Sequence, residues 1–138
     1  MKNSGSYILI MKLERDKKIK VGSLGYINFK KGYYFYCGSG KKNLSQRIER
    51  HKRKNKKNFW HIDYLREKSE YISAMTFDKL TECQLAEKLK NITESSINNF
   101  GCSDCKCNSH LFYSPEAPDL KTLKLIHNLP ICIDIKTK

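Results

Sequence analysis

The first forty residues are organised as short apolar runs separated by charged or glycine-containing turns. The run 6–13 is apolar and rich in β-favouring side chains, so it predicts a first strand. After a charged turn at 14–18, the alternation over 19–22 predicts a short second strand, and a loop punctuated by glycines follows. The aromatic run 33–36 predicts a third strand, which the next two glycines end. This part of the chain therefore predicts strands joined by short turns.

Helical patterns begin after residue 42. Asn43 is a suitable N-cap and Gln46 follows at capping-box spacing, so a first helix is expected from there to between 53 and 57. The segment 59–65 predicts a second helix that buries its apolar positions, Phe59, Ile62 and Leu65.

A further strand and a third helix are expected next. Alternation over 70–77 predicts the strand. Asp78 or Thr81 is a suitable cap for a helix that runs to about residue 92. The buried stripe of this helix is expected to consist of Leu85, Leu89 and Ile92.

The order of these elements describes a small α+β protein. A chain of 138 residues is large enough for one core, so a single domain over 1–138 is expected. Its sheet is predicted to be small, central and mixed or antiparallel, flanked by about three helices. The apolar stretch 129–135 predicts a last strand.

Charge changes the picture because it is unevenly distributed. The formal net charge is +13, and residues 1–58 carry 17 Lys and Arg against 3 Asp and Glu. Residues 59–138 carry 10 against 11. Such asymmetry favours a polyanionic partner, since neutralising phosphates releases counterions. We therefore expect a nucleic acid as partner; the alternative is a solvated basic face that only keeps the protein soluble.

The chain shows no export signal and no membrane-spanning segment. Its first apolar run, 7–11, is much shorter than the ~20 residues that a spanning helix needs. A cytoplasmic location is expected, where the six cysteines stay reduced and are metal ligands or core residues rather than disulfides.

The segment from Tyr36 to His51 combines an aromatic strand, a glycine turn and a basic helix. Arg47 and His51 lie one helical turn apart and share a face with Leu44, the expected anchor of this helix. A strand that ends in Tyr and feeds a helix with Arg and His is suited to holding a phosphate and moving a proton. Taken alone, the two side chains are more simply interpreted as ordinary charges on a basic helix.

A cysteine-rich segment follows Gly101. It places four soft ligands within nine residues, and zinc binds such sets tetrahedrally. The candidate ligands of this structural zinc site are Cys102, Cys105, Cys107 and His110, with Cys83 as an alternative to Cys102. A group of reduced, partly buried thiols is the other interpretation.

Several motifs resemble the signature of the GIY-YIG nuclease family. They are Gly5-Ser6-Tyr7, Tyr36-Cys37-Gly38, and the helix with Leu44, Arg47 and His51. Other segments resemble the Uri-type branch of that family more narrowly: 60–65, Glu82-Cys83 and 103–111. The resemblance covers residues 5–113.

The chain also departs from the family pattern. Tyr7 and Tyr36 are separated by 28 residues, more than in the usual tight hairpin, so we expect an excursion through 20–31 that leaves the two strands paired. The triplet 32–34 is too close to Tyr36 to supply the first motif from a separate strand. Ser6 and Cys37 replace the usual isoleucines.

The resemblance implies a role for each site residue. Tyr7 and Tyr36 would line the site and bind water or phosphate, and Arg47 would stabilise negative charge on the phosphate. His51 would orient the nucleophile or relay its proton. Glu82 would hold a divalent cation, Mg²⁺ or Mn²⁺, that polarises the scissile phosphate. A downstream asparagine is also implied, with Asn98, Asn99 and Asn108 as alternatives.

Each of these residues has a structural alternative. Tyrosines on strands usually pack in a core, and a carboxylate in the first turn of a helix is favoured by the helix dipole alone. Glu82, however, lies three, four and seven residues before apolar positions of its helix, where a spare charge is costly.

Two functions follow from these observations. The first is a metal-dependent endonuclease that hydrolyses phosphodiester bonds in DNA. The second is a non-catalytic basic module that binds nucleic acid and carries a structural metal site. Both use a nucleic-acid-binding surface on and around the first helix, for which the candidates are Lys41, Lys42, Arg50, Lys52, Arg53 and Lys54.

Overall fold

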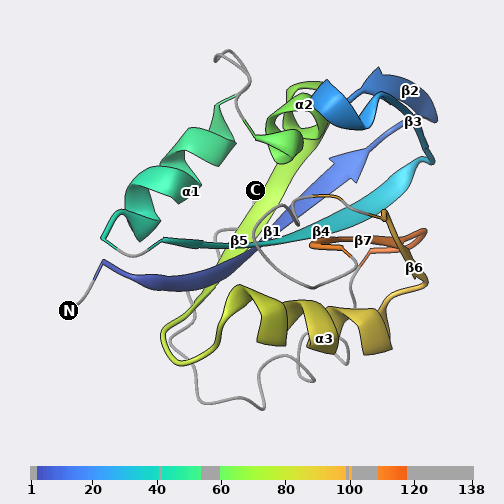
Figure 1. Cartoon of the computed structure of the whole chain (residues 1–138). Coiled ribbons are helices and arrows are strands. Elements are labelled where there is room, and N and C mark those ends of the chain that lie inside the picture. Colours follow the sequence, from blue (N-terminus) through green and yellow to red (C-terminus); the bar gives the residue numbers. More distant parts are fainter. Residues whose placement is uncertain (1–2, 41, 54–59, 99, 101–108, 118–138) are drawn as a thin grey trace.

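The protein is built around a five-stranded sheet in which every strand pairs antiparallel with its neighbours (Figure 1). The computed structural model describes residues 3–40, 42–53, 60–98, 100 and 109–117. The strand order is β5-β1-β4-β7-β6, with bounds β1 Gly5–Leu13, β4 Gly32–Gly40, β5 Glu70–Phe77, β6 Ser95–Ser96 and β7 Leu111–Ser114. With three helices among the described residues, the fold is α+β, and the predicted fold class is confirmed.

The two long strands β1 and β4 pair along their whole length, from Gly5 opposite Gly40 to Leu13 opposite Gly32. The chain between them forms its own two-stranded sheet, β2 Lys17–Lys20 and β3 Tyr26–Phe29, joined by a short 3-10 turn, Gly22–Leu24. The expected excursion thus leaves β1 and β4 paired. The prediction of a loop over residues 26–29 was wrong, because these residues continue the alternation of exposed and buried positions that a strand needs.

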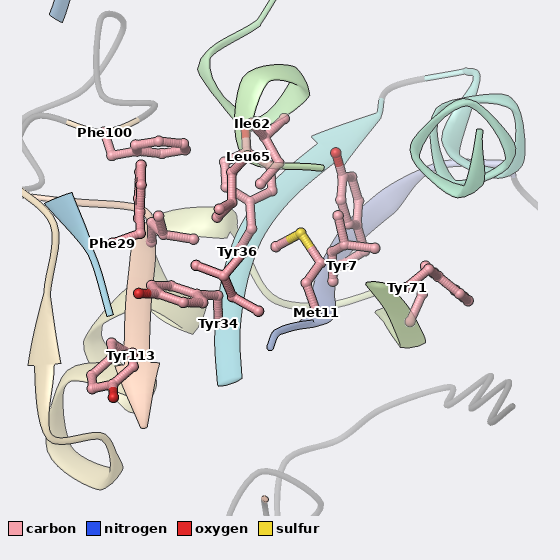
Figure 2. Close-up of a cluster of buried hydrophobic side chains, with 14 of the residues drawn as sticks. Tyr7, Met11, Phe29, Tyr34, Tyr36, Ile62, Leu65, Tyr71, Phe100 and Tyr113 are labelled. Carbon is pink, nitrogen blue, oxygen red and sulfur yellow. The ribbon is translucent and has the colours of Figure 1, made fainter. Parts of the chain in front are cut away.

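The helices cover both faces of the sheet (Figure 1). Helices α1 Leu44–Lys52 and α2 His61–Lys68 lie on one face, and α3 Glu82–Ile92 lies on the other. Because strand side chains alternate between faces, β1 contributes to two separate cores. Tyr7, Leu9 and Met11 join the core beneath α1 and α2, shown in Figure 2, whereas Ile8 and Ile10 join the core beneath α3.

Helices α1 and α3 begin where predicted, whereas α2 runs from His61 to Lys68 and not over the predicted 59–65. Asn43 is the N-cap of α1, but its side chain makes no capping hydrogen bond, so the predicted capping box is wrong. Asn3 takes over this role: its Oδ1 accepts from the Ser45 N–H at 2.8 Å, and its Nδ2 donates to Gln46 Oε1 at 2.6 Å. An asparagine from the N-terminal segment therefore ties that segment to the first turn of α1.

The third helix has the expected start. The Thr81 hydroxyl accepts from the backbone N–H of Gln84, and the Gln84 side chain accepts from the Thr81 N–H, a complete capping box. Leu85 and Leu89 are buried as predicted, but Ala86 completes the buried stripe and Ile92 is only half-buried.

The two short strands that follow β4 in the strand order, β7 and β6, were not predicted. The four residues of β7 are too few to show a period, and β6 consists of two serines. The predicted strand over 129–135 and the predicted buried Phe59 lie outside the described residues. Within the described ranges, no helix combines the length and apolar character required to cross a membrane.

Candidate functional site

The two motif tyrosines lie on the same face of the β1–β4 pair. Tyr7 stands opposite Gly38 and Tyr36 stands opposite Leu9, so the tyrosines are diagonal neighbours with ring centroids 6.4 Å apart (Figure 2). Gly38 makes room for this arrangement, since a Cβ at that position would lie 2.4 Å from both Cζ and Oη of Tyr7. At Gly5 a Cβ would lie 2.4 Å from the Phe77 carbonyl oxygen. Steric exclusion of a side chain therefore explains the glycine in each motif.

The Tyr7 hydroxyl is hydrogen-bonded to His51 Nε2 at 2.6 Å. Both residues are almost fully buried, with 2% and 0% of their surfaces exposed. Burial raises the pKa of the Tyr7 phenol well above its usual value, and the neighbouring Tyr36 adds to the effect. The phenol is therefore neutral at physiological pH while it is hydrogen-bonded to the imidazole.

Arg47 lies one turn before His51 on α1 and reaches back to the end of β4. Its Nη1 donates to the carbonyl oxygen of Ser39 at 2.8 Å, and its guanidinium lies 4.9 Å from the centroid of the Trp60 ring. Its positive charge lowers the pKa of both site tyrosines, although burial outweighs this effect. Within the described residues no carboxylate lies within ion-pairing distance of Arg47, and its buried Nε has no hydrogen-bond partner there.

Glu82, the first residue of α3, approaches the same cluster from the other face of the sheet. Its carboxylate raises the pKa of both Tyr7 and Tyr36, and for Tyr36 this is the largest cause after burial. The side chain is 34% exposed, and its Oε2 lies 3.8 Å from Nδ1 of the buried His110. The structure thus brings the five predicted catalytic residues into one region: Tyr7, Tyr36 and His51 contact one another, and Arg47 and Glu82 lie within electrostatic range of both tyrosines.

A second arginine of α1, Arg50, has a different environment from the one predicted. It makes a bidentate ion pair with the buried Asp63 of α2, at 2.6 and 2.8 Å. It also lies over the Trp60 ring, 4.6 Å from the centroid, while Asp63 Oδ2 accepts from the Trp60 N–H at 2.8 Å. The charge of Arg50 thus neutralises a buried carboxylate, and the expected contact of Arg50 with nucleic acid stays a prediction.

Arg66 of α2 holds the C-terminal end of α1. Its Nε donates to the His51 carbonyl oxygen at 2.6 Å, and its Nη2 donates to the Lys52 carbonyl oxygen at 3.0 Å. A cation that satisfies the last carbonyls of a helix also complements its dipole. Arg66 therefore fixes the turn that carries His51 through hydrogen bonds to its backbone.

These supporting residues were not predicted as part of the site. Trp60 and Asp63 were assigned to a helix and to a segment that resembles the Uri-type branch, with no role of their own. A carboxylate three residues after position 60 was a signal for the local capping contact. No sequence pattern indicated the role of Arg66, because the carbonyl oxygens that accept its hydrogen bonds belong to another helix.

The other predicted nucleic-acid-binding residues are distributed unevenly. Lys42 and Arg53 are exposed, as such a surface requires. Lys52 makes an ion pair with Glu49, one turn away on the surface of α1, at 2.8 Å. Lys41 and Lys54 lie outside the described residues.

The zinc prediction rests mostly on residues that the structure does not describe, Cys102, Cys105 and Cys107. Its remaining members, Cys83 and His110, are neighbours, with Sγ and Nε2 3.9 Å apart. Among the described residues, no group of three or more His, Cys, Asp or Glu side chains is placed to hold a metal ion. The zinc site stays a prediction. Of the three candidate asparagines, Asn98 is exposed and the other two are not described.

The cluster combines a buried hydrogen-bonded pair of a tyrosine and a histidine, an arginine held by its helix and strand, and a partly exposed carboxylate. Comparison with the curated proteins and with the solved structures gave no match. A family model described as a domain of unknown function, DUF123, matches residues 6–129. This match covers Tyr7, the second tyrosine motif, α1, α2 and α3, and the chain therefore belongs to the DUF123 family.

Proposed function

We propose that this chain is a metal-dependent endonuclease of the GIY-YIG type, in its Uri-like branch, that hydrolyses phosphodiester bonds in DNA. The observation that carries the proposal is the buried hydrogen bond of 2.6 Å between Tyr7 and His51, next to Arg47. Burying two polar side chains is favourable only when they are partnered, and a hydrophobic pair would fill the same space at less cost. A proton-transfer role explains their presence in the core.

The pair suggests a route for the proton of an attacking water molecule. A phenol with a raised pKa is a poor base by itself, so Tyr7 would take a proton only while passing its own to His51. Imidazole accepts a proton near neutral pH, which suits it as the final acceptor. In this scheme His51 is the base and Tyr7 is the relay that contacts the water.

Arg47 is suited to binding the phosphate. It is held in place by the Ser39 carbonyl and by Trp60, so little reorganisation would be needed when negative charge develops on the phosphate oxygens. A planar guanidinium also matches two phosphate oxygens at once. Tyr36, on the neighbouring strand, would hydrogen-bond to the same group.

Glu82 is the one predicted ligand for a divalent cation, and its chemistry fits Mg²⁺ or Mn²⁺. Mg²⁺ keeps most of its water ligands and is often bound by one or two carboxylates together with substrate phosphate oxygens. A partly exposed carboxylate suits this mode better than a closed cage of protein ligands. When bound, the cation would supply positive charge that stabilises the leaving oxygen of the phosphate. His110, 3.8 Å from Oε2, would orient the carboxylate.

The test is cleavage of supercoiled plasmid and of branched DNA with Mg²⁺, with and without a chelator. We expect cleavage that the chelator abolishes and that falls at least ~100-fold in Glu82→Gln and in Arg47→Ala. Glu87→Gln is the matched control, because Glu87 is an exposed carboxylate of the same helix. Binding without cleavage, unchanged in Glu82→Gln, would instead support the non-catalytic binding module.

A further inference from the structure

The β2–β3 hairpin presents one polar face to solvent and anchors the other in the core. Its register pairs Lys18 with Asn28 and Lys20 with Tyr26, and these four residues are all exposed. Because side chains alternate along a strand, all four lie on the same face of the hairpin. The opposite face carries Ile19 and Phe29, which are buried in the core beneath α1 and α2.

This outer face joins uncompensated positive charge to an exposed aromatic ring. Tyr26 is the large hydrophobic residue that stands out as exposed among the described residues, at 66%, and Lys18 Nζ lies 5.3 Å from its ring centroid. The described ion pairs include neither Lys18 nor Lys20. Residues 14–31 contain six Lys and Arg against two acidic residues. One of the two, Asp16, points to the base of the hairpin, where its Oδ1 accepts from the Lys31 N–H at 2.7 Å.

We propose that the outer face of the β2–β3 hairpin binds duplex DNA, as a contact separate from the catalytic cluster. A two-stranded ribbon fits the major groove of B-DNA, which is ~12 Å wide, whereas the major groove of A-form RNA is too narrow for it. The lysines would contact phosphates, Asn28 can hydrogen-bond to base edges, and Tyr26 supplies an apolar surface between them. The choice of DNA rests on the proposed function.

The position of the hairpin agrees with a role in holding a duplex across the catalytic cluster. The hairpin leaves β1 at Leu13, six residues after Tyr7, which corresponds to roughly 20 Å along the strand. Both regions belong to the core on one face of the sheet, the face covered by α1 and α2 (Figure 1). At ~3.4 Å per base pair, a single duplex lying along this face would meet the hairpin about six base pairs or more from the cleaved bond.

The experiment measures binding of a 30-base-pair DNA duplex without divalent cations, over a series of salt concentrations. Lys18→Ala/Lys20→Ala is compared with Lys88→Ala/Lys90→Ala, which removes two exposed lysines from α3, on the other face of the sheet. We expect the hairpin variant to bind on the order of tenfold more weakly and to lower the slope of log K against log salt by about 1.8. Tyr26→Ala is expected to weaken binding several-fold with an unchanged slope.

Absence of cleavage would overturn the proposed function alone, because this assay requires no chemistry. Equal binding by the hairpin variant and the α3 variant would overturn the hairpin proposal, even if the protein cleaves DNA. Failure of the wild-type protein to bind the duplex would also overturn it. The same dependence observed only with an RNA duplex would reject DNA as the ligand.

Discussion

The paired strands β1 and β4 have two ends that differ in chemistry. At the end with Tyr7 and Gly38, a buried phenol and a buried imidazole are hydrogen-bonded to each other, and the half-buried Arg47 donates to the Ser39 carbonyl. At the other end, the same two strands open into the β2–β3 hairpin, whose lysines and Tyr26 are exposed. The first end has the fixed geometry that the proposed proton transfer would need. The second has accessible charge, which suffices for binding but not for chemistry.

The same contrast occurs within helix α1. Arg47 and Arg50 lie one turn apart and both stack on Trp60, yet within the described part of the chain only Arg50 has a buried carboxylate as partner. Arg50 is therefore expected to contribute to stability and Arg47 to substrate binding. The two arginines carry the same charge, and their expected roles differ because Arg50 is paired with Asp63.

The largest effect is expected when the Tyr7 hydroxyl is removed. Tyr7→Phe should lower the cleavage rate on the order of 10³-fold, since it breaks the proton route to His51. Tyr34→Phe is a matched control at the other end of the strand pair, because Tyr34 is equally buried and its hydroxyl donates only to the Lys30 carbonyl. Both variants should lose about 1–2 kcal/mol of unfolding free energy, measured with urea. Equal activity in the two variants would contradict the assigned role of Tyr7.

The two arginines of α1 should separate activity from stability. Arg47→Ala is expected to lose ~10²- to 10³-fold in cleavage rate with little change in unfolding free energy. Arg50→Ala leaves Asp63 buried without its partner and should cost about 3 kcal/mol, with the activity of the folded fraction largely retained. Urea denaturation and single-turnover cleavage measure the two quantities. The reverse pattern would mean that Arg50, and not Arg47, meets the substrate.

Alkaline pH should reveal that the site tyrosine is buried in its neutral form. The pKa of Tyr7 is raised by burial, so above pH ~10 the unfolded chain loses a proton that the folded chain keeps. The unfolded state then binds fewer protons, and the unfolding free energy falls as pH rises. Tyr7→Phe should reduce this dependence by about 1.4 kcal/mol per pH unit, and so should Tyr34→Phe, whose pKa is raised for the same reason. If Tyr7→Phe leaves the slope of unfolding free energy against pH unchanged, the phenol of Tyr7 in the wild-type protein ionises as freely as in water.

The smallest effect is expected at the surface of α1. Lys52→Ala removes an exposed ion pair with Glu49 and should change the unfolding free energy by less than about 0.5 kcal/mol. It should also weaken duplex binding less than Lys42→Ala does, because Lys42 is exposed and Lys52 is engaged with a carboxylate. Filter-binding titrations of the two variants measure this difference. A stronger effect of Lys52→Ala would show that its ion pair opens on binding.

The sequence predicted those parts of the fold in which a regular spacing of apolar residues extends over several turns of a helix or along a whole strand. The 70–77 strand and the third helix, with its Thr81 cap, were found because apolar spacing and capping residues lie close together in the chain. The strand β7 and the Asn3 contact with α1 were missed, since four residues show no period and Asn3 is 42 residues from Ser45. The five candidate catalytic residues came from motif resemblance, and their proximity depends on pairing that no local pattern encodes. The roles of Asp63 and Arg66 arise only when two helices pack.

The most direct test of the central claim is a crystal structure of the Tyr7→Phe variant with duplex DNA and Mg²⁺. The Tyr7–His51–Arg47 cluster is proposed to be where a phosphate is cleaved, so a phosphodiester group should lie between Arg47 and Glu82. We expect guanidinium nitrogens of Arg47 at hydrogen-bond distance from its oxygens and a metal ion bound by Glu82. DNA bound with no phosphate in contact with either residue would contradict the account.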